Sequence, residues 1–95
     1  MTRVVVVPAA AEDLARLIVT HSLPADTHER VKRSLRPLSD FPLLGAQLEG
    51  RWDEFRFILG PWRWMLNLYA FDREQDLISV VGIQDGRAFR VPLSG

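Results

Sequence analysis

Two arginines on neighbouring predicted strands, Arg56 and Arg63, are the side chains best placed to bind an anion. If the Gly-Pro pair at 60–61 forms a two-residue turn, Leu59 pairs with Trp62 and the register of the hairpin follows. The two arginines are then diagonal neighbours on one face, with Cβ atoms roughly 7 to 8 Å apart. That spacing suits adjacent phosphate groups, which arginine recognises through paired hydrogen bonds.

Like charges this close repel each other by on the order of 1 kcal/mol even near water, so an anion between them would stabilise the pair. The alternative is neutralisation by Asp53, Glu54 or a more distant carboxylate, which would make an ordinary solvated face. Arg87, just beyond the last predicted strand, could join the two arginines. The sequence leaves both readings of the pair open.

The hairpin face that carries these arginines is the more polar one, and we expect it to be exposed. The predicted binding residues are Arg56, Arg63, Met65, Asn67, Tyr69 and Arg87. Tyr69 could stack on a base or donate a hydrogen bond, although a strand tyrosine more often packs with its hydroxyl at the surface. The opposite face is expected to form the core against the helices, and it carries Phe55, Phe57, Leu59, Trp62, Trp64, Leu66 and Leu68.

The elements that must position this hairpin follow in order along the chain. Residues 3–7 are a β-branched apolar run that predicts a buried strand. Apolar residues at helical spacing then predict a helix that ends at residues 22–24, where a proline stops it. Asp26, with Glu29 three residues later, resembles a capping box that opens a second helix, and Pro37 should end or kink that helix. The short connection makes the helices an antiparallel hairpin.

A loop without clear period, from Phe41 to Trp52, leads back to the sheet. Three strands follow, at 55–59, from 62 to about 71, and at 77–83. The order predicts an α+β fold with an N-terminal strand, a two-helix antiparallel hairpin and a three-stranded antiparallel meander, the helices lying on one sheet face. The length of 95 residues leaves room for a single domain, residues 1–95.

Composition limits the function classes. Hydrophobic residues make up 47% and charged residues 25%, which is typical of a globular domain. Twelve basic residues balance twelve acidic ones, so any role with nucleic acid would depend on a local cluster of cations. The chain has no cysteine, and neither His21 nor His28 has a second ligand at metal spacing. We therefore expect no metal and no cofactor.

The N-terminal apolar run, Val4 to Val7, is too short for a signal peptide or a membrane span. The sequence also lacks a nucleotide-binding glycine loop and a hydrolase motif. We therefore expect a cytoplasmic protein that has no membrane partner.

The stretch from Phe55 to Arg87 resembles the sheet of the RelE/ParE superfamily of toxins, the plasmid-stabilisation type found in type II toxin–antitoxin modules. In that superfamily an opening strand, a helical hairpin with an acidic-leucine pair and a segment with proline and glycine before the sheet recur in the same order. Here the pair is Glu12-Asp13-Leu14 and the segment is FPLLGAQLEG. The resemblance covers nearly the whole chain.

Members of the RelE branch cleave messenger RNA on the ribosome, with basic residues on the sheet face. The resemblance implies that Arg56, Arg63 and Arg87 would be catalytic and would stabilise the charge that develops as a ribose hydroxyl attacks the neighbouring phosphate. The general acid for the leaving oxygen is missing. Ile58 stands where a lysine would help, and Phe89 lies near the position of the expected tyrosine.

The ParE branch is similar in fold, lacks the nuclease residues and is associated with poisoning of DNA gyrase. The departures above make a ParE-like growth inhibitor the first hypothesis, a ribosome-dependent endoribonuclease the second, and a non-toxic binding module that retains the fold the third. The chain is an enzyme only under the second hypothesis. Either toxin branch implies a cognate antitoxin that covers apolar surface and neutralises basic groups, with Met65 and Phe71 expected at the contact.

Overall fold

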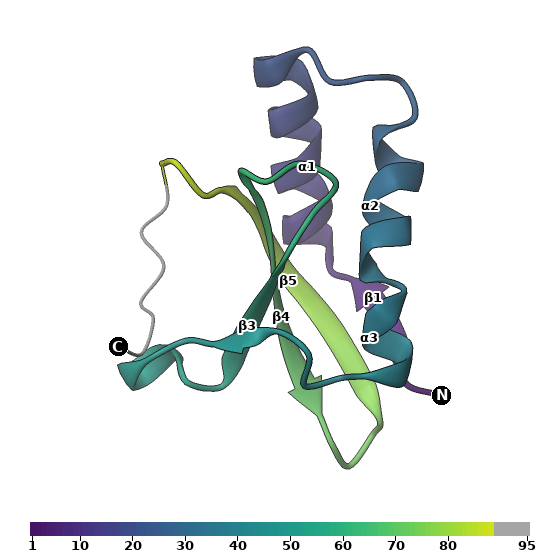
Figure 1. Ribbon diagram of the computed structural model, residues 1–95, viewed down its shortest axis with the longest axis vertical. Helices are drawn as coiled ribbons and strands as arrows, with labels where there is room; N and C mark the ends of the chain where they lie inside the picture. Colours follow the sequence, from purple (N-terminus) through teal and green to yellow (C-terminus); the bar gives the residue numbers. More distant parts are fainter. Residues whose placement is uncertain (89–95) are drawn as a thin grey trace.

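A computed structural model describes residues 1–88 as a mixed five-stranded sheet with helices packed against it (Figure 1). The strands are β1 (Arg3–Val6), β2 (Ala46–Gln47), β3 (Phe55–Leu59), β4 (Met65–Asp72) and β5 (Leu77–Asp85). The helices are α1 (Pro8–His21), α2 (Thr27–Leu35), α3 (Pro37–Asp40) and the 3-10 turn η1 (Gly50–Trp52). The α+β class is confirmed, and β2, α3 and η1 are additions to the predicted order.

The sheet has the strand order β1-β5-β4-β3-β2. β3, β4 and β5 form the predicted antiparallel meander, and β1 lies parallel to β5. The N-terminal strand therefore pairs with the last strand of the sheet, and α1 packs on β5.

The boundaries of α1 follow local chemistry. Pro8 occupies the start of the helix, where its missing amide costs no hydrogen bond. The helix ends where Ser22 adopts a left-handed conformation with φ of 51°, and the amide of Leu23 then closes the last turn on the carbonyl of Ile18 at 3.0 Å. The predicted stop at residues 22–24 is confirmed.

The predicted capping box at α2 is wrong in detail. Asp26 precedes the helix, but its carboxylate makes no capping bond. It instead accepts hydrogen bonds from Nε of Arg30, at 3.0 Å to each carboxylate oxygen. The first turn is held by Thr27, whose hydroxyl donates to the carbonyl of Pro24 at 2.5 Å. Pro37 ends α2 as predicted and begins the short helix α3.

The register predicted for the β3–β4 hairpin is wrong. Leu59 pairs with Leu66, four residues beyond Trp62. The turn comprises residues 60–64, and it is closed by the amide of Gly60, which donates to the carbonyl of Met65 at 2.8 Å. Because a shift of four residues is even, the residues that stay in β3 and β4 keep their predicted same-face neighbours, whereas residues 62–64 lie in the turn.

The predicted assignment of the two sheet faces is inverted. Met65, Asn67 and Tyr69 have no exposed surface and lie against the helices. Of the set expected in the core, Phe55, Phe57, Leu59, Leu66 and Leu68 lie on the opposite face, with Leu59 50% exposed. Trp62 and Trp64 are in the turn, where they are half-buried and pack against the core.

The last strand explains this inversion. On the helix-covered face β5 contributes the buried side chains of Ile78, Val80 and Ile83. On the other face β5 carries Leu77, Ser79, Gly82 and Gln84, of which only Leu77 is a large apolar residue. Burying the β-branched set of β5 therefore outweighs the aromatic preference of β3. The core joins these residues to Ala10, Leu14, Val31, Leu35, Leu38, Met65 and Tyr69.

Candidate functional site

The structure separates the three predicted arginines. Arg56 lies within β3, whereas Arg63 lies in the turn after that strand and Arg87 follows the end of β5. The amide of Gly86 donates to the carbonyl of Trp64 at 2.6 Å, so the chain segments that carry Arg63 and Arg87 run side by side. Two of the three arginines therefore share one end of the sheet, and Arg56 is not with them.

Arg56 is bound to the loop that precedes β2. Its Nη1 atom donates to the carbonyl oxygen of Gly45 at 2.8 Å and to that of Leu43 at 3.3 Å. A guanidinium that satisfies backbone carbonyls is held in place by the fold and positions the loop. The predicted anion-binding pair of Arg56 and Arg63 is therefore not formed.

Tyr69 is a packing residue with a buried, fully used hydroxyl. The phenolic oxygen donates to the carbonyl of Pro42 at 2.9 Å and accepts from the amide of Gly45 at 2.8 Å. Burial raises the pKa of Tyr69 above its usual value of 10, and the bond from Gly45 and the charge of Arg56 partly offset this. The prediction that Tyr69 could stack on a base is wrong. Phe89, at the position of the expected tyrosine, lies outside the described residues.

Gly45 is required by this loop. A Cβ atom there would lie 2.6 Å from the carbonyl oxygen of Phe57 and 2.7 Å from the phenolic oxygen of Tyr69. Such contacts are too short for any larger residue, so glycine alone lets the loop approach the sheet.

Met65 and Asn67 are also internal. Met65 belongs to the core, and Phe71, the other predicted antitoxin contact, packs against that core. Asn67 donates from Nδ2 to the hydroxyl of Ser34 on α2 at 3.2 Å, and its Oδ1 atom has no hydrogen-bond partner among residues 1–88. The predicted exposed polar face is wrong because the helices cover it.

Arg87 is paired with a carboxylate. Its Nε and Nη2 atoms donate to the two oxygens of Asp85, each at 3.0 Å, and its amide donates to the same carboxylate at 2.9 Å. The hydrogen bonds from the guanidinium and then from the amide hold the pKa of Asp85 at about 2, against a usual 3.8. The same pair raises the pKa of Arg87. The charge of Arg87 is therefore neutralised locally.

His21, the last residue of α1, meets this ion pair. Its Nε2 atom lies 3.4 Å from the Oδ2 atom of Asp85, and its side chain is 26% exposed. The imidazole also packs on the ring of Trp64, with ring centroids 4.6 Å apart. His21, for which the sequence indicated no role, therefore lies beside Asp85 and Trp64.

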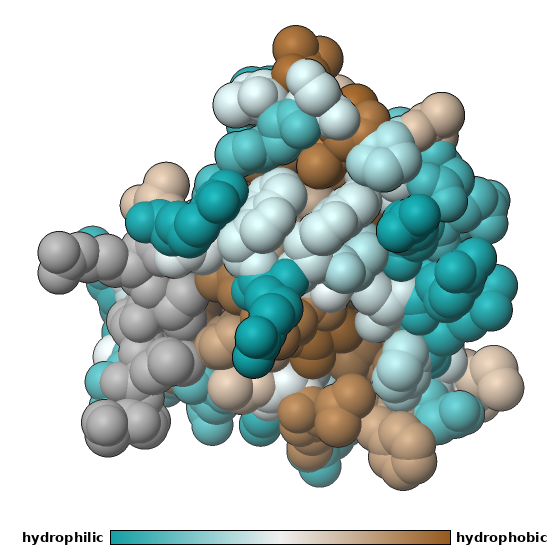
Figure 2. Space-filling model, turned by 45° about the horizontal axis from the view of Figure 1, so that its top comes forward, coloured by the Kyte–Doolittle hydropathy of each residue, from teal (hydrophilic) through white to brown (hydrophobic). Residues whose placement is uncertain are grey.

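The tryptophans of the turn complete this end of the molecule. Trp62 and Trp64 stack at 6.2 Å, and guanidinium groups lie over both rings, Arg87 at 5.0 Å from Trp64 and Arg30 at 5.7 Å from Trp62. We call this set the tryptophan cluster; it comprises His21, Arg30, Trp62, Arg63, Trp64, Asp85 and Arg87. Figure 2 looks toward this end of Figure 1, where residues of intermediate hydropathy cross the middle of the surface and hydrophilic ones gather on the α2 side.

Arg63 is the arginine of the tryptophan cluster that has no ion pair among the described residues. It is on the surface of the turn, and within residues 1–88 no carboxylate oxygen lies within 4.0 Å of its guanidinium nitrogens. Of the three predicted arginines, Arg63 is therefore the one whose charge faces solvent without a carboxylate in contact.

The sequence contained one signal for the tryptophan cluster. A Gly-Pro pair followed by a Trp-Arg-Trp segment fits a longer turn as well as a two-residue one, and the longer turn brings both tryptophans out of the strand. No local signal placed His21 there, because its position depends on how α1 packs on β5.

Within residues 1–88, no group of three histidine, aspartate or glutamate side chains is arranged to hold a metal ion. Each helix in that range is too short or too polar to cross a membrane. The sequence matches no protein-family model and no curated protein.

Proposed function

We propose that this chain is the toxin of a type II toxin–antitoxin module, a ParE-like cytoplasmic growth inhibitor that binds an essential protein such as DNA gyrase and is neutralised by a cognate antitoxin. The order of strand, helical hairpin and antiparallel meander agrees with the resemblance to RelE/ParE toxins. That order supports the proposal at the level of fold alone.

The observation that carries the proposal is the composition of the tryptophan cluster. Arg63 is exposed between two half-buried tryptophans, and further arginines lie over both rings. Tryptophan and arginine are the side chains most enriched where protein–protein contacts contribute most of the binding energy. The half-buried rings are held by stacking, so little conformational entropy would be lost when a partner covers them.

The contacts of the other predicted residues favour a binding toxin over a nuclease. Stabilising the charge of a phosphate undergoing attack needs cations that are free to face it. The guanidinium of Arg56 donates to loop carbonyls, and that of Arg87 donates to the carboxylate of Asp85. The hydroxyl of Tyr69 is buried and engaged on both sides, so it does not supply the general acid.

Two observations favour the second candidate, a RelE-like endoribonuclease. His21 lies beside Asp85 and Arg87, and an imidazole there could give the leaving oxygen the proton for which the sequence offered no donor. The stacked tryptophans could also hold unpaired bases.

Induction of the chain without its partner tests the proposal. Growth should stop, and pulse labelling should show an early loss of DNA synthesis with later effects on translation. Early loss of translation with cleaved messenger RNA would support the endoribonuclease instead. Unaltered growth with abundant folded protein would indicate the third hypothesis, a binding module without toxicity.

A further inference from the structure

The strand β1 is an edge of the sheet with unused hydrogen-bonding groups. The amides of Arg3 and Val7 donate to carbonyls on the β5 side, at 3.2 and 3.1 Å. Val4 and Val6 alternate with these positions, so their amide and carbonyl groups point to the other side, where residues 1–88 supply no further strand. A row of this kind is a template for pairing with another extended chain.

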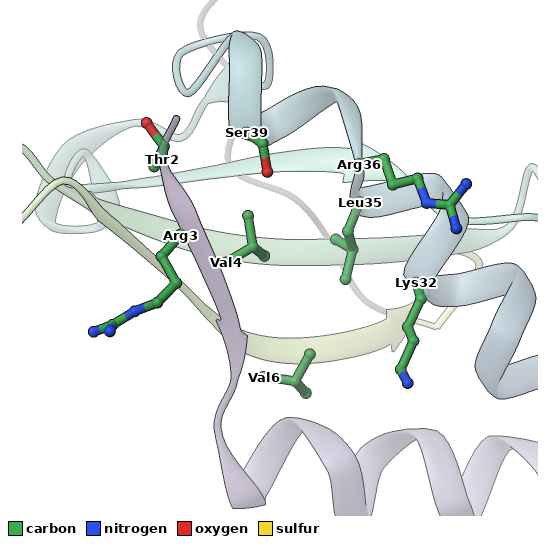
Figure 3. A pocket seen from close by; sticks show the side chains of 8 residues that line it. All are labelled: Thr2, Arg3, Val4, Val6, Lys32, Leu35, Arg36 and Ser39. Atoms are coloured by element: carbon green, nitrogen blue, oxygen red, sulfur yellow. The ribbon is translucent and has the colours of Figure 1, made fainter.

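A groove lies along this free edge, between β1 and α2 (Figure 3). Its volume is about 470 Å³, within the range typical of ligand sites. It is lined by Thr2, Arg3, Val4, Val6, Lys32, Leu35, Arg36 and Ser39. In Figure 3 the side chains of Val4, Val6 and Leu35 occupy the space between strand and helix, and Lys32 extends along it.

The polar residues of the groove are predominantly cationic. Lys32 comes from α2, Arg36 from the junction between α2 and α3, and Arg3 from β1. Figure 3 shows the two arginines directed outward on opposite sides. In the part of the chain that the structure describes, the ion pairs join other side chains, and no carboxylate oxygen lies within 4.0 Å of these three cations. The groove therefore joins an apolar floor to a rim of uncompensated positive charge.

We propose that this groove binds an extended, acidic segment of a partner protein, which adds as a strand to the free edge of β1. Main-chain hydrogen bonds to Val4 and Val6 would hold the segment, and glutamate or aspartate side chains would face the cationic rim. The identity of that partner as the antitoxin rests on the proposed function; the docking chemistry does not.

The geometry fits a short segment. An extended chain rises by about 3.3 Å per residue, so four or so residues would cover β1. Alternate side chains of the added strand would point to the helix side, toward Lys32 and Arg36, and to the other face, on the side of Arg3. The amide of Thr2 donates to the carbonyl of Ser39 at 3.0 Å, so α3 closes the edge at that end and the segment docks beside Val4 and Val6.

A peptide fits the groove better than a nucleic acid does. Unpaired nucleic acid is usually held by aromatic side chains on which bases stack, and the eight lining residues include no aromatic ring. The valine and leucine floor suits apolar side chains, and the unused amides and carbonyls suit a peptide backbone.

Titration of the isotope-labelled chain with a capped hexapeptide of alternating glutamate and valine tests the proposal. The amide signals of Val4 and Val6 should shift and become protected from hydrogen exchange. A matched peptide of alternating lysine and valine should bind more weakly by at least about tenfold. A glutamate-valine peptide N-methylated on the edge that faces β1 should also lose binding, because it cannot donate to the strand.

Charge reversal in α2 and at the residue that follows it supplies the matched variants. Lys32→Glu combined with Arg36→Glu should weaken binding of the glutamate-valine peptide by at least about tenfold. Arg33→Glu, on α2 but outside the groove, should leave this binding unchanged. A thermal unfolding midpoint for each variant verifies that it is folded. Arg63→Ala should bind the peptide normally, so loss of growth arrest and loss of peptide binding remain separate results.

The contrary outcomes are distinct. Equal binding of the lysine-valine or the N-methylated peptide would overturn the acidic-strand proposal. An oligouridylate that shifts the Val4 and Val6 signals in place of the peptide would assign the groove to nucleic acid. Shifts that depend on protein concentration, with no peptide present, would assign it to a second copy of the chain.

Discussion

The carboxylate of Asp13 on α1 accepts a hydrogen bond from the backbone amide of Ile83 on β5, 3.1 Å away. The pairing of β4 with β5 is interrupted by a bulge, because Leu68 pairs with Gly82 whereas Tyr69 pairs with Val80. This bulge lies just before Ile83. The side-chain amide of Gln84 donates to the same carboxylate oxygen at 3.2 Å. Asp13 therefore fixes the helix to the strand at the irregular part of the sheet.

Replacing Asp13 tests this anchor. Asp13→Ala should lower the free energy of unfolding by about 1 to 3 kcal/mol, because the amide of buried Ile83 loses its acceptor. Urea unfolding measures the change. Glu12→Ala, at the exposed neighbouring position, is the control and should change stability by less than about 0.5 kcal/mol. Equal effects of the two variants would contradict the anchor.

Tyr69→Phe tests the buried hydroxyl. Removing the phenolic oxygen leaves the amide of Gly45 and the carbonyl of Pro42 without partners, so unfolding should become easier by about 1 to 3 kcal/mol. Chemical denaturation of both proteins gives this difference. An unchanged stability would mean that the hydroxyl is exposed, as the sequence had suggested.

The same hydroxyl predicts a response to alkaline pH. Because the folded state raises the pKa of Tyr69, the folded chain keeps the phenolic proton at a pH where the unfolded chain has released it. Stability should therefore fall as the pH rises above about 10, the pKa of an unperturbed tyrosine. The pH dependence of unfolding in Tyr69→Phe should lack this decline. If stability fell with pH in the same way in the parent chain and in Tyr69→Phe, the raised pKa of Tyr69 would be contradicted.

Arg56 and Arg63 should respond differently to truncation. Arg56→Ala should lower stability by about 1 to 3 kcal/mol, because it frees the carbonyls of Leu43 and Gly45. Arg63→Ala should change stability by less than about 0.5 kcal/mol, yet it should restore colony formation after induction. Thermal unfolding and plating measure the two effects. Full toxicity of folded Arg63→Ala would remove the tryptophan cluster as the working surface.

Asp85 predicts a response to acid. The pKa of Asp85 is depressed to about 2, against a usual value of 3.8. At a pH above 3.8 the ionised carboxylate therefore stabilises the folded state. That contribution should be lost as the pH falls from about 4 to about 2. Over this range the stability of Asp85→Asn should decline less steeply than that of the parent chain. Acid titration of the unfolding midpoint measures the difference. A decline as steep as that of the parent chain would show that other carboxylates dominate.

Much of the fold follows from local signals in the sequence. Pro8, the residues at 22–24 and Pro37 mark helix boundaries because proline and left-handed residues act within one turn of the chain. The class and the antiparallel meander follow from hydrophobic periods of a few residues. These features need no knowledge of distant contacts.

The candidate site depended on non-local choices. The Gly-Pro pair at 60–61 permits turns of different length, and the packing of Trp64 on His21 accompanies the longer one. The side chains of β5, the strand that follows the hairpin, determine which face of the hairpin is covered. A pattern confined to β3 and β4 could not reveal either choice, and so it placed Met65, Asn67 and Tyr69 at the surface.

The pairing of the first strand with the last one also governs when the chain can fold during its synthesis. The hydroxyl of Thr2 donates to the carboxylate of Asp76, a bond that spans 74 residues of sequence. Ribosomes extend a chain by roughly 5 to 20 residues per second, so β1 must wait several seconds for its neighbour. The sheet, and with it the edge formed by β1, can therefore be completed only after β5 has been synthesised.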